Sequence, residues 1–466
     1  MALMSYEKGL ETLLTNIAPY ERVEKIAITA CLGRVLAEDI TAPNDYPAFA
    51  TASMDGYAVR FSEQDSPLAI IGAMGAGSDF KFSPKARECV KTMTGALMSA
   101  GLDTLVPVEN VEVVSAAGVE NGKNALKNAT NAPKNSANSQ ENSQNSTKNL
   151  KNSQISAPKS EILSKNSVNS QKNSQNSPKN STQNSTLIIK QKVPQNHAVR
   201  AVGESYKKGE ILLKKGAKLG FSEIALLAEL GCFHISVFAR PTIGVLSSGD
   251  ELKDLGEVPQ NPAQIRSSNH IAIAALARSF GARAVVFPLL KDERNAVKKA
   301  LANALECCDI LITTGGVSMG DFDYLKTAIC DYELIIDRLD IKPGRHIKVA
   351  KSGKKFILAF PGFPYSSMVA FHLYAREILN AWLLQPKDYV IKAFLRGNYA
   401  KKSPYFEFIA CNVECENGRL WANLEGKKQG SSAIIGNLNH KAALMLVPKE
   451  RANIADGELV DIMLLS

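Results

Sequence analysis

The chain has 466 residues, of which 45% are hydrophobic and 22% are charged, a composition typical of a globular protein with about three domains. No run of about 18 apolar residues occurs, so we expect no membrane-spanning helix and no membrane partner. Most of the net charge of +9 lies in the segment 121–190, which has no aromatic side chain for base stacking, so we expect no nucleic-acid partner.

The N-terminus and the cysteines both indicate a cytoplasmic protein. The first residues lack the basic start, apolar run and small-residue cleavage site of a signal peptide. The 8 cysteines include no Cys-x-x-Cys pair, and Cys411 and Cys415 have no nearby His that would complete a zinc site. We therefore expect reduced thiols that serve in packing.

The first predicted element is a helix from Ser5 to Pro19, with Ser5 as the N-cap and Pro19 as the stop. Short segments punctuated by Gly and Pro follow over 20–120, which predicts a small β-rich domain. A second helix is expected over 222–230, because Gly231 directly follows its last apolar residue.

A tract at about 121–186 is rich in Asn, Ser and Lys. It has too little apolar surface to offset the chain entropy lost on folding, so we predict a disordered insert. Runs of β-branched residues on its two sides, over 104–114 and 186–193, predict strands. We therefore expect the insert to replace a hairpin loop, which a fold tolerates at small entropic cost.

From Arg240 onward, predicted strands and helices alternate, which indicates a parallel sheet covered by helices. The strands are expected over 242–246, 284–290, 309–314 and 355–360, and the helices over 268–281, 293–305, 324–330 and 366–383. Residues 386–466 lose the helical period and predict a small β-barrel or sandwich.

In an open parallel sheet, ligands bind beyond the carboxyl ends of the strands. The loops expected there lie at 247–252, 291–292, 313–323 and 360–366. Within them, Gly315, Gly316 and Ser318 allow backbone amides to approach an anion at the start of a helix, which favours a phosphate guest. A plain Gly-Gly turn is the alternative.

Five acidic residues on the same loops could bind Mg²⁺ between phosphates, since carboxylate oxygens are its preferred protein ligands. They are Asp250, Glu251, Asp292, Asp321 and Asp323. Each could instead cap a helix. Lys342 and Arg345 flank a Pro-Gly turn and could hold a second anion, although a solvated turn is equally consistent with the pair. No Ser, His and Asp are placed for covalent catalysis.

Six phrases in the chain, taken together and in order, resemble the molybdopterin molybdenumtransferases, a family that includes the E domain of gephyrin. They are SMDGYAV (53–59), MTGA (93–96), SGDEL (248–252), GGVSMGDFDY (315–324), IKPG (341–344) and PGFP (361–364). The resemblance spans the chain except the insert, and six ordered motifs are far more specific than any one of them.

The resemblance implies an α/β multidomain fold. Its expected parts are a discontinuous helical linker domain at 1–40 and 198–237, an inserted β-rich domain at 41–197, a molybdopterin-binding α/β domain at 238–385 and a C-terminal β-barrel at 386–466. It also implies the insertion of molybdate into the dithiolene of adenylylated molybdopterin with release of AMP, assisted by Mg²⁺. The substrates would be small molecules, the protein would be a homodimer, and a molybdopterin adenylyltransferase would act upstream of it.

The family's functional residues map onto numbered positions here. The implied catalytic residues are Asp55, Thr94, Asp250, Glu251 and Lys342, although local sequence alone makes Asp55 a turn residue. The implied metal ligands are Asp292, Asp321 and Asp323. The implied substrate-binding residues are Arg200, Gly315, Gly316, Ser318, Arg338, Arg345, Pro361, Gly362, Ser366 and Ser431.

Five positions depart from the family pattern. Ser205 replaces an Asp, Phe363 an Asn, His346 a Pro and Arg338 a Lys, and Ala410 stands near the place of an Arg. These departures leave open a non-catalytic molybdopterin-binding or scaffold protein of the same fold. A third reading, nucleic-acid binding through the Lys- and Asn-rich tract, would show salt-dependent affinity that vanishes with the insert.

Overall fold

The computed structural model describes residues 3–79, 81–115, 118–121, 185–291, 293–316, 324–440 and 442–465. Its contacts divide the chain into a main unit, Met1–Thr41 with Ile211–Ser466, and an inserted unit, Ala42–Glu210. The four-part division expected from the sequence is finer and stays a prediction. Nearly all of the predicted disordered insert lies outside the described residues.

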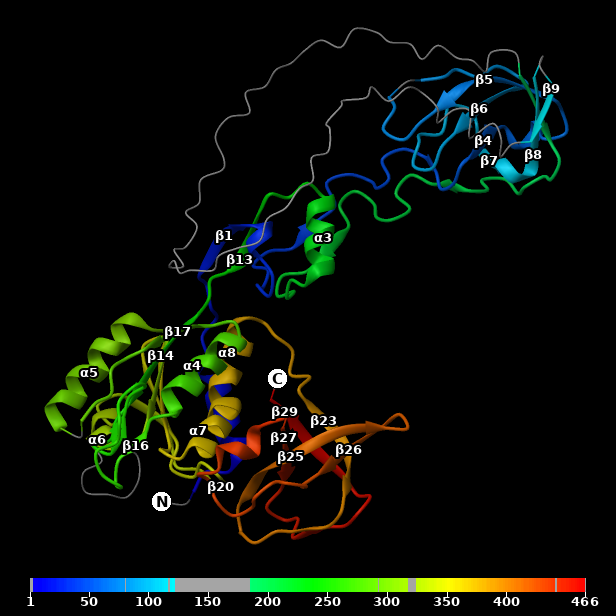
Figure 1. Ribbon diagram of the computed structural model, residues 1–466. Helices are drawn as coiled ribbons and strands as arrows, with labels where there is room; N and C mark the ends of the chain where they lie inside the picture. The colour runs from blue at the N-terminus through cyan, green and yellow to red at the C-terminus, as the bar shows by residue number, and fades with distance from the viewer. Residues whose placement is uncertain are drawn as a thin grey trace, which may run out of the picture. The chain divides into compact units, whose positions relative to one another are not determined.

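The main unit contains a six-stranded sheet (Figure 1). Its strands, in spatial order, are β17 (Arg283–Val286), β14 (Thr242–Ser247), β18 (Ile310–Thr314), β22 (Lys355–Phe360), β21 (Lys348–Ser352) and β19 (Glu333–Asp337). The first four strands are parallel, which confirms the expected helix-covered parallel sheet. The last two add an antiparallel edge that the sequence did not predict.

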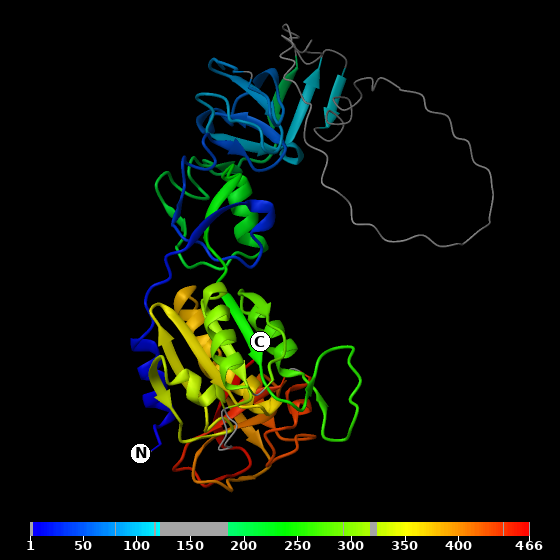
Figure 2. The ribbon, with the colours of Figure 1, turned by 90° about the vertical axis from the view of Figure 1, so that its left-hand side faces the viewer.

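Helices cover both faces of this sheet (Figure 2). On one face lie α1 (Tyr6–Thr15), α4 (Asn269–Ser279), α7 (Pro364–Ala370) and α8 (Arg376–Trp382); on the other lie α5 (Arg294–Cys307) and α6 (Tyr324–Ile329). The chain order places β17 and β18 on opposite sides of β14, so the strand order reverses beside β14. This is the switch point at which doubly wound sheets bind ligands.

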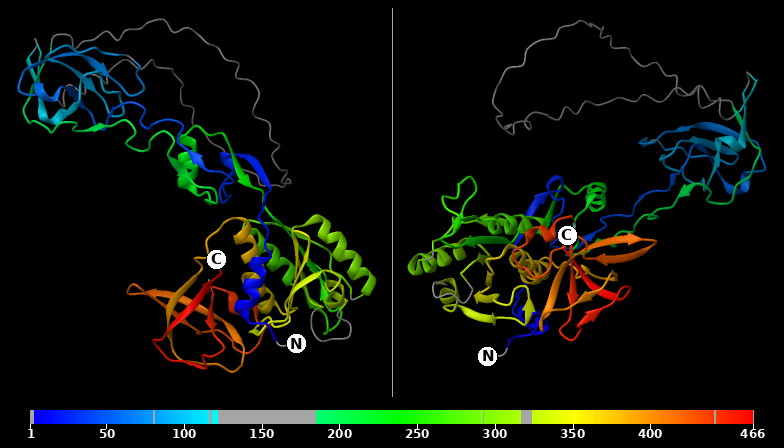
Figure 3. Two further views of the ribbon diagram at one scale, coloured as in Figure 1. Left: turned by 180° about the vertical axis from the view of Figure 1, so that it is seen from behind. Right: turned by 60° about the horizontal axis from the view of Figure 1, so that its bottom comes forward.

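The two terminal helices of the prediction differ in detail from the structure. Ser5 caps α1 as expected, with its hydroxyl accepting from the Lys8 amide at 3.2 Å, but the helix ends at Thr15. The single helix expected over 366–383 is divided by a π-helical turn, Phe371–Ala375. In Figure 3, α1 runs beside α8, and their side chains share one core with the barrel.

The C-terminal segment forms a closed five-stranded barrel, because β25 pairs with both β26 and β27. Its strands are β23 (Val390–Arg396), β25 (Phe406–Glu416), β26 (Arg419–Asn423), β27 (Ala443–Val447) and β29 (Leu459–Leu464). The short strand β20 (Ile341–Lys342) pairs in parallel with β25 and places Lys342 opposite Glu407. The barrel and the loop after β19 are thus joined by backbone hydrogen bonds.

Several short elements complete the main unit. They are the pairs β1 (Val23–Ala27) with β13 (His234–Phe238), β2 (Ile40–Thr41) with β12 (Ile211–Leu213), β15 (Leu252–Lys253) with β16 (Ile265–Arg266) and β24 (Tyr399–Ala400) with β28 (Asn453–Ile454), the helix α3 (Phe221–Glu229), and the 3₁₀ turns Ile28–Ala30 and Ile435–Leu438. Helix α3 confirms the helix expected over 222–230.

The inserted unit is built on a seven-stranded sheet. Its strands, in spatial order, are β7 (Thr104–Pro107), β4 (Gly56–Val59), β6 (Glu88–Thr92), β5 (Leu68–Met74), β10 (Thr186–Ile189), β8 (Val111–Ser115) and β9 (Gly118–Asn121), with a separate pair β3 (Thr51–Ala52) and β11 (Val199–Arg200) and 3₁₀ turns at Phe61–Glu63 and Val108–Asn110. β8 and β10 pair antiparallel, as expected for strands flanking the insert. They are not joined by a simple hairpin loop, because β9 follows β8 and pairs with its other edge.

No helix in the described part of the chain has both the length and the apolar character needed to cross a membrane. All 8 cysteines are free, as expected, and Cys31, Cys89, Cys308 and Cys411 are buried.

Candidate active site

A cavity of about 680 Å³ lies at the switch point of the main sheet, beyond the carboxyl ends of β14, β18 and β22. Its size is that of a typical small-molecule site. The expected site residues that line it are Glu251, Gly315, Gly316, Lys342, Arg345, Pro361, Gly362 and Ser366. Segments far apart in the sequence therefore meet around one cavity, which we call the main cavity.

The two glycines after β18 are required by the backbone. Gly315 has φ +86°, and a Cβ there would lie 2.5 Å from the Ser248 carbonyl oxygen. Gly316 has φ +64°, and its Cβ would lie 3.0 Å from that of Leu325. Side chains are thus excluded at this point, which leaves bare backbone against the cavity, as in loops that cradle phosphates.

Cationic side chains line the side of the main cavity next to β20. The Lys342 ammonium lies 3.4 Å from the Glu407 carboxylate, and the Arg345 guanidinium lies 3.9 Å from the centre of the Tyr405 ring. Burial lowers the pKa of His346, and the charges of Arg345 and Arg338 lower it further. The surroundings of these residues therefore favour an anion over a cation.

The start of α7 forms another wall. Asn269, at the start of α4, donates from Nδ2 to the Gly362 carbonyl at 2.7 Å, which ties α4 to this wall. Phe363, one of the departures, is 59% exposed and caps α7 without a side-chain hydrogen bond. The Asn-to-Phe departure thus removes a polar group from the rim of the cavity.

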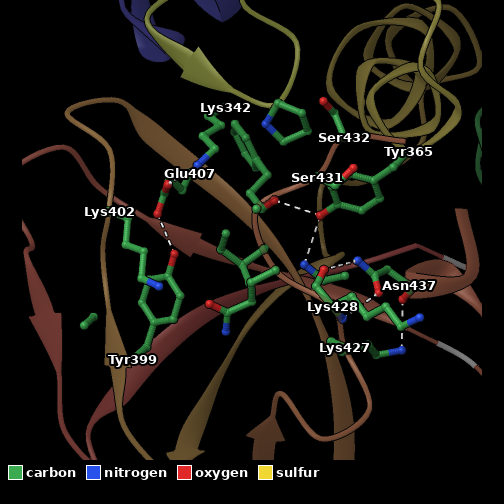
Figure 4. Close-up of a pocket in the computed structure, with 17 residues that line it drawn as sticks. Lys342, Tyr365, Tyr399, Lys402, Glu407, Lys427, Lys428, Ser431, Ser432 and Asn437 are labelled. Atoms are coloured by element: carbon green, nitrogen blue, oxygen red, sulfur yellow. Dashed lines mark hydrogen bonds and ion pairs between the residues drawn. The ribbon is translucent and has the colours of Figure 1, made fainter. Parts of the chain in front are cut away.

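A second, smaller pocket of about 150 Å³ opens on the barrel side and shares Lys342, Pro343 and Ser432 with the main cavity (Figure 4). We call it the barrel pocket. Four lysines line it, Lys342, Lys402, Lys427 and Lys428, together with Ser431. Ala410 lies on its wall, where its amide donates to the Tyr365 hydroxyl at 3.0 Å. The Arg absent at 410 is therefore replaced by a pocket rich in Lys.

One buried carboxylate, that of Glu407, also belongs to the barrel pocket. It accepts hydrogen bonds from Tyr399 at 2.5 Å and Ser403 at 2.8 Å, and it pairs with Lys342. Burial lowers the pKa of Lys427. An anion entering the pocket would meet four cationic side chains and one carboxylate that already has partners.

The structure brings together a Ser, a His and an Asp that the sequence analysis did not single out; the expectation that no such set serves covalent catalysis stays a prediction. The Ser267 hydroxyl lies 2.7 Å from His270 Nδ1, and His270 Nε2 lies 3.2 Å from an Asp254 oxygen. No local pattern marks this set, since the loop between β15 and β16 brings Asp254 back to the start of α4. Ser267 lines the main cavity.

In the inserted unit, Asp55 and Thr94 lie in direct contact. One Asp55 oxygen accepts from the Thr94 amide at 2.7 Å and from its hydroxyl at 2.8 Å. These two hydrogen bonds, and then the charge of Lys91, hold the pKa of Asp55 below its usual value. Asp55 is therefore a fixed, ionised carboxylate at neutral pH.

Arg200 belongs to the same corner of the inserted unit, because β3 pairs with β11 and its Ala52 exchanges backbone hydrogen bonds with the 93–96 segment. The Arg200 guanidinium donates to Glu204 at 3.1 Å and to Ser205 at 2.9 Å. Ser205, which stands where the family has Asp, thus keeps a hydrogen bond to Arg200 but adds no negative charge beside it. The charge partner of Arg200 is Glu204.

The remaining expected site residues are distributed as follows. Ser431 lines the barrel pocket, whereas Asp250 and Arg338 line neither cavity. Ser318, Asp292, Asp321 and Asp323 lie outside the described residues. Within the described ranges, no three His, Cys, Asp or Glu side chains converge on a metal site. The sequence did not single out Lys402, Lys427, Lys428 or Ser267, which no motif marks.

Comparison with known proteins assigns the chain to a family. A family model described as the MoeA N-terminal region (domain I and II) matches residues 4–231, and one described as a probable molybdopterin binding domain matches residues 244–381. Crystal structures of MoeA molybdopterin biosynthesis proteins from Pyrococcus horikoshii cover at least 99% of this chain and 100% of their own, with TM-scores of 0.72 and 0.71 at 22% and 24% identity, which supports the fold.

Curated relatives match along nearly their whole length. The chain is 26% identical to the molybdopterin molybdenumtransferase of Bacillus subtilis over 453 residues, 95% of this chain and 90% of the relative. It is 25% identical to that of Haemophilus influenzae over 479 residues, 99% of this chain and 98% of the relative. The chain therefore belongs to the molybdopterin molybdenumtransferases, a family of enzymes of molybdenum cofactor biosynthesis.

Proposed function

We propose that this enzyme inserts molybdate into the dithiolene of adenylylated molybdopterin and releases AMP. The observation that carries the proposal is that two cavities of different size adjoin each other and share a cationic residue, Lys342. The main cavity, about 680 Å³, can hold a nucleotide-sized ligand against Gly315 and Gly316, and the barrel pocket, about 150 Å³, suits a small oxyanion. Lys342 borders both.

The four lysines of the barrel pocket make it the proposed entry site of molybdate. Lys342 and Lys427 are partly buried, so their attraction for an oxyanion held there would be stronger than in open solvent. Tetrahedral dianions such as molybdate are recognised by this type of charge cluster together with hydroxyl donors such as Ser431. Lys402 and Lys428 would then offset the absence of an Arg at 410.

Mg²⁺ fits the carboxylates near the main cavity only in part. Glu251 lines the cavity and Asp250 precedes it, while the proposed ligands Asp292, Asp321 and Asp323 lie outside the described residues. Bound Mg²⁺ would offset the negative charge of the phosphate oxygens. We propose Glu251 and Asp250 as residues that orient such a metal from the end of β14.

The same proposal extends to the inserted unit and to the enzyme's setting. We propose catalytic roles for Asp55 and Thr94 and a substrate-binding role for Arg200, supported by the ionised state of Asp55 and its fixed contact with Thr94. We further propose a cytoplasmic homodimer that receives its substrate from a molybdopterin adenylyltransferase.

The decisive experiment measures AMP release from adenylylated molybdopterin with and without molybdate. Lys402→Gln and Lys428→Gln together should raise the molybdate concentration needed for half-maximal release by about tenfold, because both lysines are exposed and solvent screens each contact to about 1 kcal/mol or less. Lys354→Gln is the matched control, because Lys354 is exposed and pairs with Glu21 outside both cavities. Binding of the adenylylated substrate without any molybdate-dependent release would assign a non-catalytic binding role instead.

A further inference from the structure

The Ser267, His270 and Asp254 side chains form a hydrogen-bonded chain that ends at the main cavity. Ser267 is 5% exposed and His270 is 3% exposed, so both are fixed by their surroundings. Asp254 is partly exposed and accepts from the outer end of the imidazole. The direction of each hydrogen bond in this chain can be assigned from the donors and acceptors available.

The assignment begins at Asp254. A carboxylate oxygen accepts, so in the tautomer that we propose His270 Nε2 carries the proton of that hydrogen bond. In this tautomer Nδ1 is an acceptor, and the Ser267 hydroxyl donates its one hydrogen to it. Ser267 therefore presents lone pairs, and no hydrogen, to the main cavity.

One neighbouring polar group has the same character. Asn269 donates from Nδ2 to the Gly362 carbonyl, which fixes its amide so that Oδ1 is an acceptor. That oxygen, on a residue only 7% exposed, has no hydrogen-bond partner among the residues that the structure describes. A buried acceptor without a donor is costly, so this end of the cavity favours a ligand that supplies donors.

We propose that Ser267 and Asn269 form an acceptor pair that binds the N–H groups of the substrate's heterocycle, with His270 and Asp254 as positioning residues that hold Ser267 as an acceptor. The inference rests on the proposed function and adds an orientation to it. The anionic groups of the substrate would face Gly315, Lys342 and Arg345, and its uncharged ring would face α4. The ring could be the pterin or the adenine of the adenylylated substrate, since both carry an exocyclic amine.

Binding of four probes to the intact protein tests the proposal and separates the two rings. AMP is compared with purine riboside 5′-monophosphate, which lacks the amine, and 6-hydroxymethylpterin phosphate is compared with its 2-dimethylamino analogue. Ser267→Ala should weaken AMP about fivefold to tenfold, or the pterin phosphate by that factor, and leave the matching analogue unchanged. Ser279→Ala, at the exposed far end of α4, is the control.

Variants of the two positioning residues, His270 and Asp254, test the direction of the hydrogen bonds. In His270→Asn the amide oxygen can take the place of Nδ1 and still accept from Ser267, so affinity should stay within about twofold. His270→Leu should show the loss seen for Ser267→Ala. In Asp254→Asn the new amide can donate to Nε2, which moves the ring proton to Nδ1 and turns the Ser267 hydrogen toward the cavity. That variant should then favour the probe without the amine.

Several results would overturn the proposal. If Ser267→Ala lowers the affinity for all four probes equally, or for none of them, Ser267 does not accept a hydrogen bond from the ring. Failure of wild-type protein to bind any probe, or a covalent adduct on Ser267 after turnover, would do the same. Loss of melting temperature in His270→Asn and His270→Leu alike, with equal loss of affinity, would leave only a structural role. Absence of AMP release with ligand discrimination intact would refute the proposed function and not this inference.

Discussion

Replacing Asp55 by Asn changes one charge while keeping the shape of the side chain. The Asn oxygen can accept both hydrogen bonds that Asp55 accepts from Thr94, at 2.7 and 2.8 Å. Local sequence also tolerates the change, since Asn suits a turn before Gly as well as Asp does. The variant therefore separates a turn residue from a catalytic carboxylate.

The two readings predict effects of different size. Hydrogen bonds to a charged acceptor are stronger than neutral ones by about 1 kcal/mol, and partial exposure of Asp55 screens that difference. We expect a loss of about 1 kcal/mol or less, equivalent to a melting temperature lower by about 2–4 °C. An electrostatic catalytic group contributes about a hundredfold in rate, or about 2.7 kcal/mol. The rate effect should therefore exceed the stability effect clearly.

The assay compares molybdate-dependent AMP release, affinity for the adenylylated substrate and the melting temperature. Asp55→Asn should lose release by about a hundredfold, keep its affinity for the adenylylated substrate, and lower the melting temperature by no more than about 2–4 °C. Asp103→Asn is the matched control in the same unit, because Asp103 likewise accepts from a backbone amide, that of Phe61 at 2.7 Å, and its pKa is also lowered. Turnover at the level of the wild type would return Asp55 to the turn category and refute the reasoning.

Three further predictions concern the insert, the metal and pH. Deleting 122–184 and joining the ends by a short turn should leave the melting temperature and AMP release nearly unchanged, and a large loss of either would contradict the predicted disorder. Asp292→Ala and Asp321→Ala should raise the Mg²⁺ concentration needed for turnover without unfolding the protein; an unaltered Mg²⁺ titration would remove both from the metal site. Burial lowers the pKa of His372 to about 3, whereas the pKa in the unfolded chain is 6.5. Between these two pH values the unfolded state binds more protons than the folded state. The free energy of unfolding therefore falls as the pH drops below 6.5. Between pH 7.5 and 5 the wild type should lose roughly 2 kcal/mol that His372→Gln does not lose, measured by tryptophan fluorescence, since Trp382 and Trp421 both belong to the main unit.

The alternation of strands and helices after Arg240 could be predicted because the hydrophobic pattern of these elements is strong. β14, β18 and β22 are buried throughout or nearly so, and their apolar runs identify them without knowledge of their neighbours. β19 and β21 were not predicted, although they are as long as β18, because charged residues such as Glu333, Lys348 and Lys351 interrupt their apolar runs. Their pairing depends on contacts along an edge that no local pattern records.

The candidate site divides in the same way. Glycines and prolines at strand ends have local backbone reasons, so Gly315, Gly316 and Pro361 could be predicted to lie on one rim. Lys402 and Lys428 could not, because closure of the barrel and its pairing with β20 bring them beside Lys342. The hydrogen-bonded set of Ser267, His270 and Asp254 likewise depends on a loop returning across 13 residues, from 254 to 267.

Because β20 pairs with β25, Lys342 lies between the main cavity and the barrel pocket. On the proposed function it would contact a ligand in each of them. Lys342 lines both cavities, so an anion in one of them would change the potential that an anion meets in the other. Thermodynamic linkage requires the effect to be reciprocal: the factor by which a phosphate ester alters molybdate affinity equals the factor by which molybdate alters phosphate-ester affinity. Because the two anions would share the positive charge of Lys342, each would weaken the binding of the other. On the proposed function, AMP bound in the main cavity would therefore weaken the binding of molybdate in the barrel pocket.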